Sequence, residues 1–206
     1  SLAFLVIIVG ILKNSNKYGL NQDDLIDLIL ITTPVGIVCA RIFYVLVNWS
    51  FYRNNLSEIY KIWHGGLAIY GGVIGGIITI YLFCRKRNIN TLKLLDHIVV
   101  YLVLGQVIGR WGNFVNQELF GRPTDLPWAL YVEPRYRPTG YESYSTYHPT
   151  FLYEALWNIL GIVVLLAIEK RAQLRWGSFF ALYLVWYGLG RVIVESLRVD
   201  PSMQFL

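Results

Sequence analysis

The stretch IVVYLVLGQVIG, residues 98–109, carries no charged side chain, and RWGNFVNQELFGR, residues 110–122, follows it directly. The first stretch is fit to lie in hydrocarbon. The second holds two arginines, one glutamate, two asparagines and one glutamine. Since polar groups are costly in lipid, their density here predicts a functional cluster of polar side chains at the edge of a membrane.

Apolar runs of this kind recur along the 206 residues, of which 55% are hydrophobic and only 15% charged. We distinguish six of them: 1–12, 25–49, 65–84, 94–109, 151–168 and 176–195. Most approach the roughly 20 residues that cross a hydrocarbon core, and a soluble domain carries about 25% charged residues. The sequence predicts an all-α fold, a polytopic helical membrane protein. The alternative is an apolar soluble helical protein, in which blocks this long would be unusual.

The net charge of +5 does not indicate nucleic-acid binding, because much of it falls in short loops between apolar runs. Two such loops hold Arg85, Lys86, Arg87 and Lys93, and Lys170, Arg171 and Arg175. By the positive-inside rule these loops face the cytoplasm. Loop 50–63, segment 110–150 and the C-terminal tail then lie outside.

Segment 110–150 is the one soluble-looking part of the chain, with five prolines, several tyrosines and Trp128. It predicts an ordered extracytoplasmic cap of loops and short elements. We expect this cap to belong to a single membrane-embedded domain, residues 1–206. The chain opens on SLAFLVIIVGIL without an initiator Met and ends on PSMQFL. We therefore expect a piece of a longer chain, cut at both ends.

Several types of site have no motif in this sequence. No Cys/His spacing indicates a metal site, and no Gly-x-Ser-x-Gly elbow is present. Cys39 and Cys84 lie in different apolar runs, at different expected depths, so we predict no disulfide.

The run HGGLAIYGGVIGG, residues 64–76, holds small-xxx-small glycine pairs that predict close helix packing. Its glycines beside His64 and Tyr70 would also let a ligand approach the backbone.

Ionisable side chains within or beside the apolar runs indicate a functional site, because each costs about 2.5–3.5 kcal/mol in lipid. They are Arg41, Asp96, His97, Glu154, Arg191 and Glu195. Tyr187, Arg191, Glu195 and Arg198 are spaced to share one helix face. Two arginines for one glutamate leave a positive surplus that would attract an anion. Alternatively, Arg191 and Glu195 only neutralise each other.

The polar stretch 110–122 has a similar surplus, since Arg110 and Arg122 face one carboxylate, Glu118. The guanidinium fork suits phosphate oxygens, and phospholipid phosphate is the anion available at this depth. Asn113, Asn116 and Gln117 are expected to bind a glycerol or hold the arginines, and Gly109, Gly112 and Gly121 to allow tight turns. The alternative is a hydrogen-bonded cap that only joins helices.

The stretch GRWGNFVNQELFGR, residues 109–122, resembles without a gap the Gly-Arg-x-Gly-Asn-Phe-x-Asn-x-Glu-x-x-Gly-Arg motif of the prolipoprotein diacylglyceryl transferase family. Other blocks resemble that family in the same order: ARIFYVLVNW (40–49), GGLAIYGGVIGG (65–76), HPTFLYE (148–154) and GRVIVESLR (190–198). The resemblance covers nearly the whole chain and implies a fold of seven spans, of which the first and last would be incomplete or missing here.

The resemblance implies an enzyme of the bacterial plasma (inner) membrane, multi-pass, with its active site on the extracytoplasmic side. It would transfer the diacylglyceryl group of phosphatidylglycerol to the lipobox cysteine thiol of a lipoprotein precursor and release glycerol phosphate, without metal or cofactor. It implies substrate binding by Arg110, Asn113, Glu118 and Gly121, and catalytic positions at Arg191, Glu195 and Tyr70.

Tyr70 departs from the family pattern, because many members have a histidine there that has been proposed as the base. A tyrosine with an ordinary pKa near 10 is a poor base at neutral pH, so the base is unassigned. Two other functions stay open. A transporter of an anion or lipid would favour a midplane site in a repeated fold, and a non-catalytic scaffold would use its arginines only to join helices.

Overall fold

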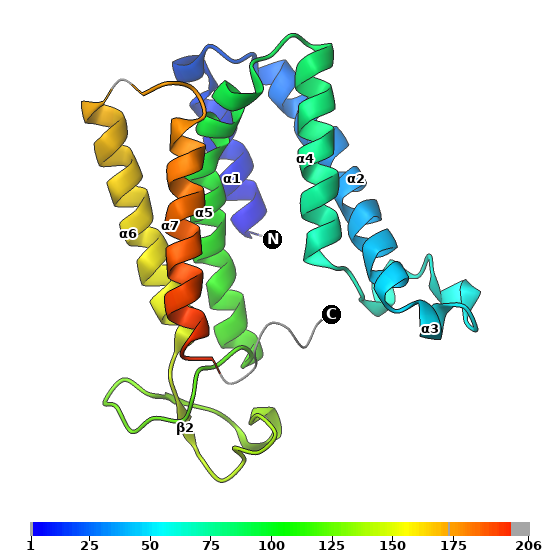
Figure 1. The fold of residues 1–206 in the computed structure, drawn as a ribbon, viewed down its shortest axis with the longest axis vertical. Coiled ribbons are helices and arrows are strands. Elements are labelled where there is room, and N and C mark those ends of the chain that lie inside the picture. Colours follow the sequence, from blue (N-terminus) through cyan, green and yellow to red (C-terminus); the bar gives the residue numbers. More distant parts are fainter. Residues whose placement is uncertain (1, 173, 199–206) are drawn as a thin grey trace. The chain divides into compact units, whose positions relative to one another are not determined.

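Residues 2–172 and 174–198 are described by a computed structural model, which is mostly helical (Figure 1). Its α-helices are α1 (Leu2–Lys13), α2 (Gln22–Val47), α3 (Trp49–Tyr52), α4 (Ile69–Lys86), α5 (Thr91–Asn116), α6 (Thr150–Arg171) and α7 (Ser178–Glu195). Two short antiparallel strands, β1 (Leu130–Tyr131) and β2 (Thr146–Tyr147), pair with Leu130 opposite Tyr147. The predicted helical fold class is confirmed. The tail PSMQFL, predicted to end outside, lies beyond the described residues.

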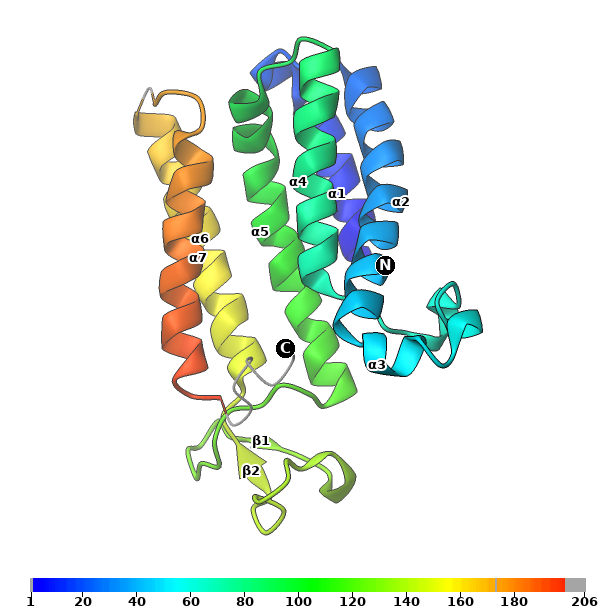
Figure 2. The same ribbon diagram turned by 45° about the vertical axis from the view of Figure 1, so that its right-hand side comes forward.

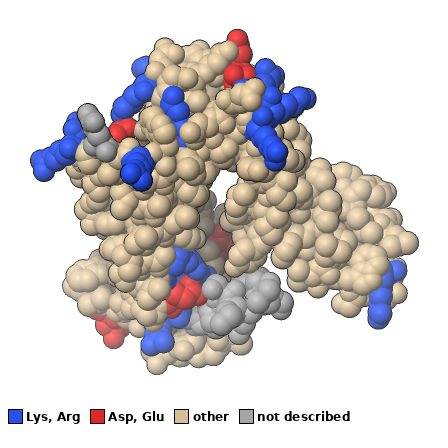
Figure 3. Space-filling model, turned by 45° about the horizontal axis from the view of Figure 1, so that its top comes forward, with Lys and Arg blue, Asp and Glu red and all other residues tan. Residues whose placement is uncertain are grey.

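Five helices within the described residues are long and apolar enough to cross a membrane: α2, α4, α5, α6 and α7. Helix α1 is apolar but has only 12 residues, as its short apolar run predicted. The flanks of the long helices expose large apolar side chains such as Val163, Val185 and Val192. Figure 3 shows Lys and Arg atoms gathered mainly near helix ends, with uncharged surface between them. This distribution is typical of helices that contact lipid.

The chain folds as two compact units. The first unit combines the chain up to Ile11 with the chain from Leu95 onward, and the second unit is Leu12–Leu94. In the first unit, α5, α6 and α7 share a core formed by Val99, Val103, Leu165, Phe179 and Tyr183. Helix α1 packs on α5, where Gly10 lies against the ring of Tyr101.

The second unit is built on the close pairing of α2 and α4. Gly71 and Gly75 are buried in this contact, and a methyl group on Gly71 would overlap the carbonyl oxygen of Cys39. The predicted packing role of these glycines is confirmed, because only a residue without a side chain lets the two backbones approach this closely. Cys39 and Cys84 are both free thiols.

The loop between α3 and α4 is organised by Arg41, whose residue is only 6% exposed. Its guanidinium donates to five backbone carbonyls: Glu58 (2.6 Å), Ile59 (2.8 Å), Lys61 (3.3 Å), Gly65 (2.6 Å) and Gly66 (2.9 Å). Arginine has five N–H donors, so this charge is stabilised by carbonyl dipoles. The burial of Arg41 is therefore explained by its hydrogen bonds to the loop. These contacts do not indicate an anion site.

Helix α4 begins at Ile69, four residues later than the apolar run 65–84 predicted. Gly65 and Gly66 have φ angles of 83° and 78°. Glycine adopts this left-handed region without a steric penalty. The two residues therefore form a turn before the helix, with their carbonyls held by Arg41.

Helix α5 corrects the prediction at its C-terminal end, because it continues through Gly109 and Gly112 to Asn116. These two glycines do not form the expected turns. The helix ends instead where Gln117 and Leu119 take φ angles of 50° and 58°. A glycine inside a helix costs only about 1 kcal/mol relative to alanine, so the segment remains helical. The cap consequently begins at residue 117. The predicted start was residue 110.

The cap, residues 117–149, has a small core of Phe120, Val132 and Tyr147, with Leu130 and Tyr141 packed against it. The buried hydroxyl of Tyr147 donates to the carbonyl of Tyr141 at 2.7 Å. Burial also raises the pKa of Tyr147. The side chains of this segment therefore organise it as an ordered element, as its prolines and aromatics predicted.

Backbone hydrogen bonds tie the cap to both neighbouring helices. The amide of Gly121 donates to His148 at 3.0 Å, just before α6, and the amide of Arg122 donates to Leu197 at 2.8 Å, just after α7. The hydroxyl of Thr150 donates to the carbonyl of Leu119 at 2.5 Å. The end of α5, the start of α6 and the end of α7 are thereby held together.

Candidate functional site

Charged side chains at one end of the first unit form a connected series of alternating sign, here called the charged chain: Arg110, Glu154, Arg191, Glu195 and Arg198. Arg110 Nη2 lies 2.5 Å from Glu154 Oε2, and Arg191 Nη1 lies 3.9 Å from the same oxygen. Glu195 Oε2 lies 2.6 Å from Arg191 Nη2 and 3.4 Å from Arg198 Nη1. In this series three arginines face two carboxylates, a surplus of one positive charge.

The direction of the helices brings these residues together. Helix α6 runs opposite to α5 and α7 (Figures 1 and 2), so its start lies beside their ends. Arg110 comes from the last turns of α5, and Glu154 comes from the second turn of α6. Arg191 and Glu195 stand one turn apart at the end of α7, as their spacing predicted.

The charged chain is partly withdrawn from solvent, most of all at two of its members. The side chain of Glu154 is 11% exposed and that of Arg198 is 6% exposed. The Arg198 Nε atom is buried without a hydrogen-bond partner among the described residues. Opposite charges attract more strongly away from water, and unpaired buried charges are costly. These arginines are therefore held in place by the two glutamates.

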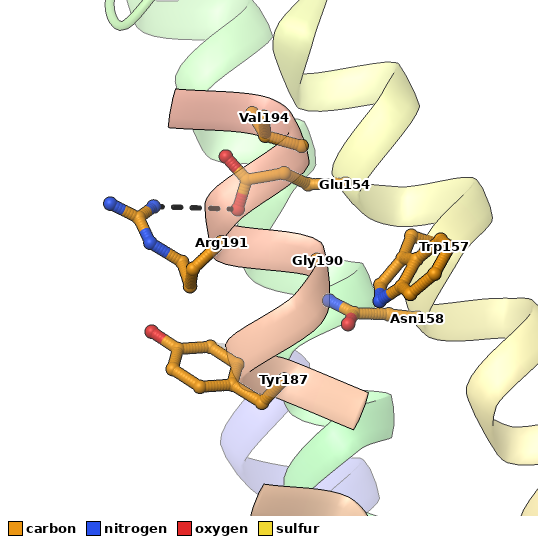
Figure 4. Close-up of a pocket in the computed structure, with 7 residues that line it drawn as sticks. All are labelled: Glu154, Trp157, Asn158, Tyr187, Gly190, Arg191 and Val194. Carbon is orange, nitrogen blue, oxygen red and sulfur yellow. Dashed lines mark ion pairs between the residues drawn. The ribbon is translucent and has the colours of Figure 1, made fainter. Parts of the chain in front are cut away.

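A small pocket between α6 and α7 lies beside the charged chain (Figure 4). It is lined by Glu154, Trp157, Asn158, Tyr187, Gly190, Arg191 and Val194. Figure 4 shows Tyr187 and Arg191 projecting to the same side of α7, with Glu154 reaching Arg191 from α6. Polar groups from both helices therefore converge on one place.

The predicted partner of Arg110 was wrong. Its carboxylate is Glu154, whereas the carboxylate of Glu118 accepts a hydrogen bond from Asn116 Nδ2 at 3.1 Å. The sequence analysis expected Gly109 and Gly112 to allow tight turns within this stretch. Because α5 continues to Asn116, Glu118 is carried away along the helix axis, at about 1.5 Å per residue.

Asn113, Gln117 and Gly121 hold the polypeptide after α5 in place. The carbonyl of Asn113 accepts from the amide of Glu118 at 3.0 Å, and Gln117 Oε1 accepts from the amide of Glu133 at 3.1 Å. A methyl group on Gly121 would lie 2.9 Å from the Leu197 carbonyl oxygen. The predicted turn at Gly121 is better described as a close backbone crossing between the cap and the end of α7.

Tyr70 belongs to the second unit, whereas the charged chain belongs to the first. It stands in the first turn of α4, 60% exposed, with its ring 6.4 Å from that of Phe43. Nearby in sequence, His64 Nδ1 lies 2.8 Å from Glu58 Oε2, and Lys61 Nζ lies 2.6 Å from Glu58 Oε1. The hydrogen bonds from Lys61 and then from His64 lower the pKa of Glu58.

Asp96 and His97 are buried at the other end of the helices and have structural partners. The carboxylate of Asp96 accepts from the amides of Gly177 at 2.6 Å and Phe180 at 2.9 Å, which caps the start of α7. His97 Nε2 lies 2.8 Å from the carbonyl oxygen of Ile11. These hydrogen bonds account for the burial of both residues without any ligand.

Glu154 is the site residue that the motif-based prediction omitted. The sequence did mark it as an ionisable side chain in an apolar run. Its role emerges only from the fold, because its two arginine partners come from different helices. Within residues 2–172 and 174–198, His, Cys, Asp and Glu form no group of three that would hold a metal ion.

The charged chain is suited to an anion that carries several oxygen atoms. Guanidinium groups bind phosphate and carboxylate oxygens in a bidentate manner. Arginines fixed in place before a reaction also stabilise negative charge that develops during it. The geometry therefore supports a phosphate-containing substrate or leaving group at the ends of α5 and α7.

Comparison with known proteins gives the family. The model of the family described as prolipoprotein diacylglyceryl transferase matches residues 1–206. A phosphatidylglycerol–prolipoprotein diacylglyceryl transferase of Ligilactobacillus salivarius is 44% identical over 206 residues, which cover 98% of this chain and 76% of the relative. Proteins of the same name from Listeria innocua (42% identical, 98% and 73% covered) and Thermotoga maritima (45% identical, 98% and 69% covered) are also similar. The chain belongs to the prolipoprotein diacylglyceryl transferase family.

Proposed function

We propose that this chain transfers the diacylglyceryl group of phosphatidylglycerol to a prolipoprotein, the reaction stated in the names of its relatives. The acceptor is the thiol of the lipobox cysteine. The bond between the diacylglyceryl carbon and its phosphate oxygen breaks, and a carbon–sulfur bond forms. Glycerol phosphate leaves with the bonding electron pair, and the proton of the thiol is released to water.

The observation that carries this proposal is the arginine surplus of the charged chain, held by Glu154 and Glu195 in a partly buried setting. Arg110 and Arg191 bind the phosphate of the lipid. As the carbon–oxygen bond breaks, negative charge grows on that phosphate. Fixed guanidinium groups stabilise the growing charge, and holding lipid and thiol together supplies the rest of the acceleration.

The remaining predicted residues take supporting roles in this proposal. Asn113, Glu118 and Gly121 shape the substrate-binding segment after α5, and their local contacts fix its backbone. Tyr70 belongs to the second unit, its catalytic position rests on the family resemblance, and it takes no assigned role as a base. An ordinary cysteine thiol has a pKa near 8.5, so activity should rise with pH as the acceptor thiol ionises.

The enzyme acts in the bilayer of the bacterial plasma membrane, with the charged chain on the extracytoplasmic side. The five candidate spans support a bilayer location. In the first unit, Lys170 and Arg171 lie in the last turn of α6, at the opposite end of that helix from Glu154. By the positive-inside rule the basic end faces the cytoplasm, which supports an extracytoplasmic position for Glu154.

The test is a transfer assay with the full-length parent chain, phosphatidylglycerol vesicles and a lipobox peptide. Glycerol phosphate release should require the peptide and should be absent when its cysteine is replaced by serine. Vesicles of phosphatidylethanolamine, with the release of ethanolamine phosphate followed instead, would show whether the headgroup matters. Release that continues with the serine peptide would overturn thiol transfer. Tyr70→Phe, run in parallel, reports whether that hydroxyl takes part.

A further inference from the structure

Trp157 of α6 and Trp186 of α7 form a reciprocal pair between the two helices. Their rings stack with centroids 4.5 Å apart and planes inclined by 21°. Each indole N–H donates at 3.1 Å to the backbone carbonyl of the other tryptophan. Each side chain is therefore hydrogen-bonded to the backbone of the other tryptophan, in addition to the stacking of the rings.

The pair is completed by a glycine on each helix, four residues after each tryptophan. The indole of Trp157 covers Gly190, and the indole of Trp186 covers Gly161. A methyl group on either glycine would overlap the facing ring. The spacing Trp-x-x-x-Gly thus occurs once in α6 and once in α7, and the two copies fit each other.

This arrangement defines the axial register between α6 and α7. A slip of one residue shifts a helix by about 1.5 Å along its axis, which would separate both N–H donors from their carbonyls. Apolar packing alone does not prevent such slips in lipid, where helix association depends on close fit and interhelical hydrogen bonds. The tryptophan pair supplies both.

The pair lies directly beside the charged chain. Trp157 follows Glu154 by three residues, and Gly190, on which its ring lies, immediately precedes Arg191. Trp157 also lines the pocket that contains Glu154 and Arg191 (Figure 4). The register that the pair fixes is therefore the register that brings Arg191 to within 3.9 Å of Glu154.

We propose that Trp157 and Trp186 are positioning residues for the transfer reaction, acting through the placement of Arg191 relative to Glu154. The inference rests on the proposed function. Misplacement of a reacting group by about 1 Å can cost up to 100-fold in rate. Loss of the pair should accordingly lower kcat. Arg191 would still bind the phosphate, but it would stabilise the charge that develops in the transition state less strongly.

The experiment uses the full-length chain in the glycerol phosphate assay with Trp157→Phe, Trp186→Phe and the double variant. Phenylalanine keeps an aromatic ring over the glycine and removes the N–H donor. Trp63→Phe, at an exposed tryptophan of the second unit, is the matched control. Melting temperature and the near-ultraviolet circular dichroism couplet of the stacked indoles are measured on the same samples.

The double variant is expected to lose the couplet and about 10-fold in kcat, with KM for phosphatidylglycerol within about 2-fold of wild type. Each single variant keeps one hydrogen bond and should lose about 3-fold. Unchanged kcat in both single variants, with the couplet lost, would overturn the proposal even if the double variant fails to fold. A lower melting temperature with unchanged kcat would also overturn it. An inactive wild type would instead count against the proposed function.

Discussion

A single carboxylate oxygen, Glu154 Oε2, lies 2.5 Å from Arg110 Nη2 and 3.9 Å from Arg191 Nη1. It therefore connects two arginines that come from α5 and α7, while belonging itself to α6. The side chain of Glu154 is 11% exposed, so little solvent shares in balancing these charges. Glu154 therefore links Arg110 to the part of the charged chain that Arg191, Glu195 and Arg198 form.

Replacing Glu154 by Gln should destabilise the protein by about 3 kcal/mol, because removing one partner of a largely buried pair leaves its arginines uncompensated. Unfolding followed in detergent micelles measures the change. Glu118→Gln is the control, since Glu118 is exposed and its carboxylate accepts a hydrogen bond from the neutral Asn116. It should change stability by less than about 0.5 kcal/mol. Equal losses in the two variants would contradict the central place of Glu154.

Gly121→Ala should destabilise the cap by about 1–3 kcal/mol, as overpacking generally does. The added methyl would meet the backbone oxygen of Leu197 and the Cβ of His148, which cannot move freely. Gly112→Ala is the matched control, because a methyl there meets no described atom within 4 Å. Alanine is the better helix former by about 1 kcal/mol, so this control should be neutral or stabilising. Comparable losses in both variants would show that the close crossing at Gly121 is unimportant.

The fold was largely predictable because its signals are long and local. Apolar runs located the helices, and the small-xxx-small spacing identified Gly71 and Gly75 as a packing surface. The ends of helices were less predictable. Gly109 and Gly112 suggested turns, but a glycine breaks a helix only when the following residues favour another path. Here the helix ends at Asn116, because the next residue, Gln117, takes the left-handed conformation without a strong sequence signal for it.

Arg41→Lys should destabilise the second unit by about 1–3 kcal/mol, since lysine has three donors where arginine supplies five. Carbonyls in the loop 56–66 would then lose their partners. Limited proteolysis of this loop, together with thermal unfolding, measures the effect. Arg53→Lys, at an exposed arginine next to α3, is the control. An unchanged cleavage rate in Arg41→Lys would show that the carbonyl contacts do not hold the loop.

Tyr147→Phe should cost about 1 kcal/mol at neutral pH, because its hydroxyl donates to the carbonyls of Tyr141 and Tyr144. Burial raises the pKa of Tyr147 above its unfolded value. The stability linked to its neutral form is therefore fully present below the unfolded pKa near 10. It is lost as pH rises through the higher folded pKa.

The pH dependence gives a second, independent check on Tyr147. Between pH 8 and pH 11, wild type should lose more unfolding free energy than Tyr147→Phe. Tyr131→Phe, at a residue that is 57% exposed, should follow the wild-type curve. If Tyr147→Phe and wild type show the same alkaline loss, the hydroxyl of Tyr147 is not buried as described.

The site was only partly predictable. The i, i+4 spacing of Arg191 and Glu195 on one helix predicted their pairing correctly, because both residues belong to one element. The pairing of Arg110 with Glu154 crosses two helices, and no local pattern specifies which faces meet. The tryptophan pair escaped prediction for the same reason, since a tryptophan near a helix centre looks like ordinary apolar surface until its partner helix is placed.

The most direct measurement compares wild type and Arg110→Ala as full-length chains in phosphatidylglycerol vesicles, with glycerol phosphate release and melting temperature recorded on the same preparations. If Arg110 stabilises the leaving phosphate, the variant should lose at least about 100-fold in thiol-dependent release, as expected when a fixed charge-stabilising donor is removed. It should still fold. A folded Arg110→Ala chain that releases glycerol phosphate at the wild-type rate would contradict the account.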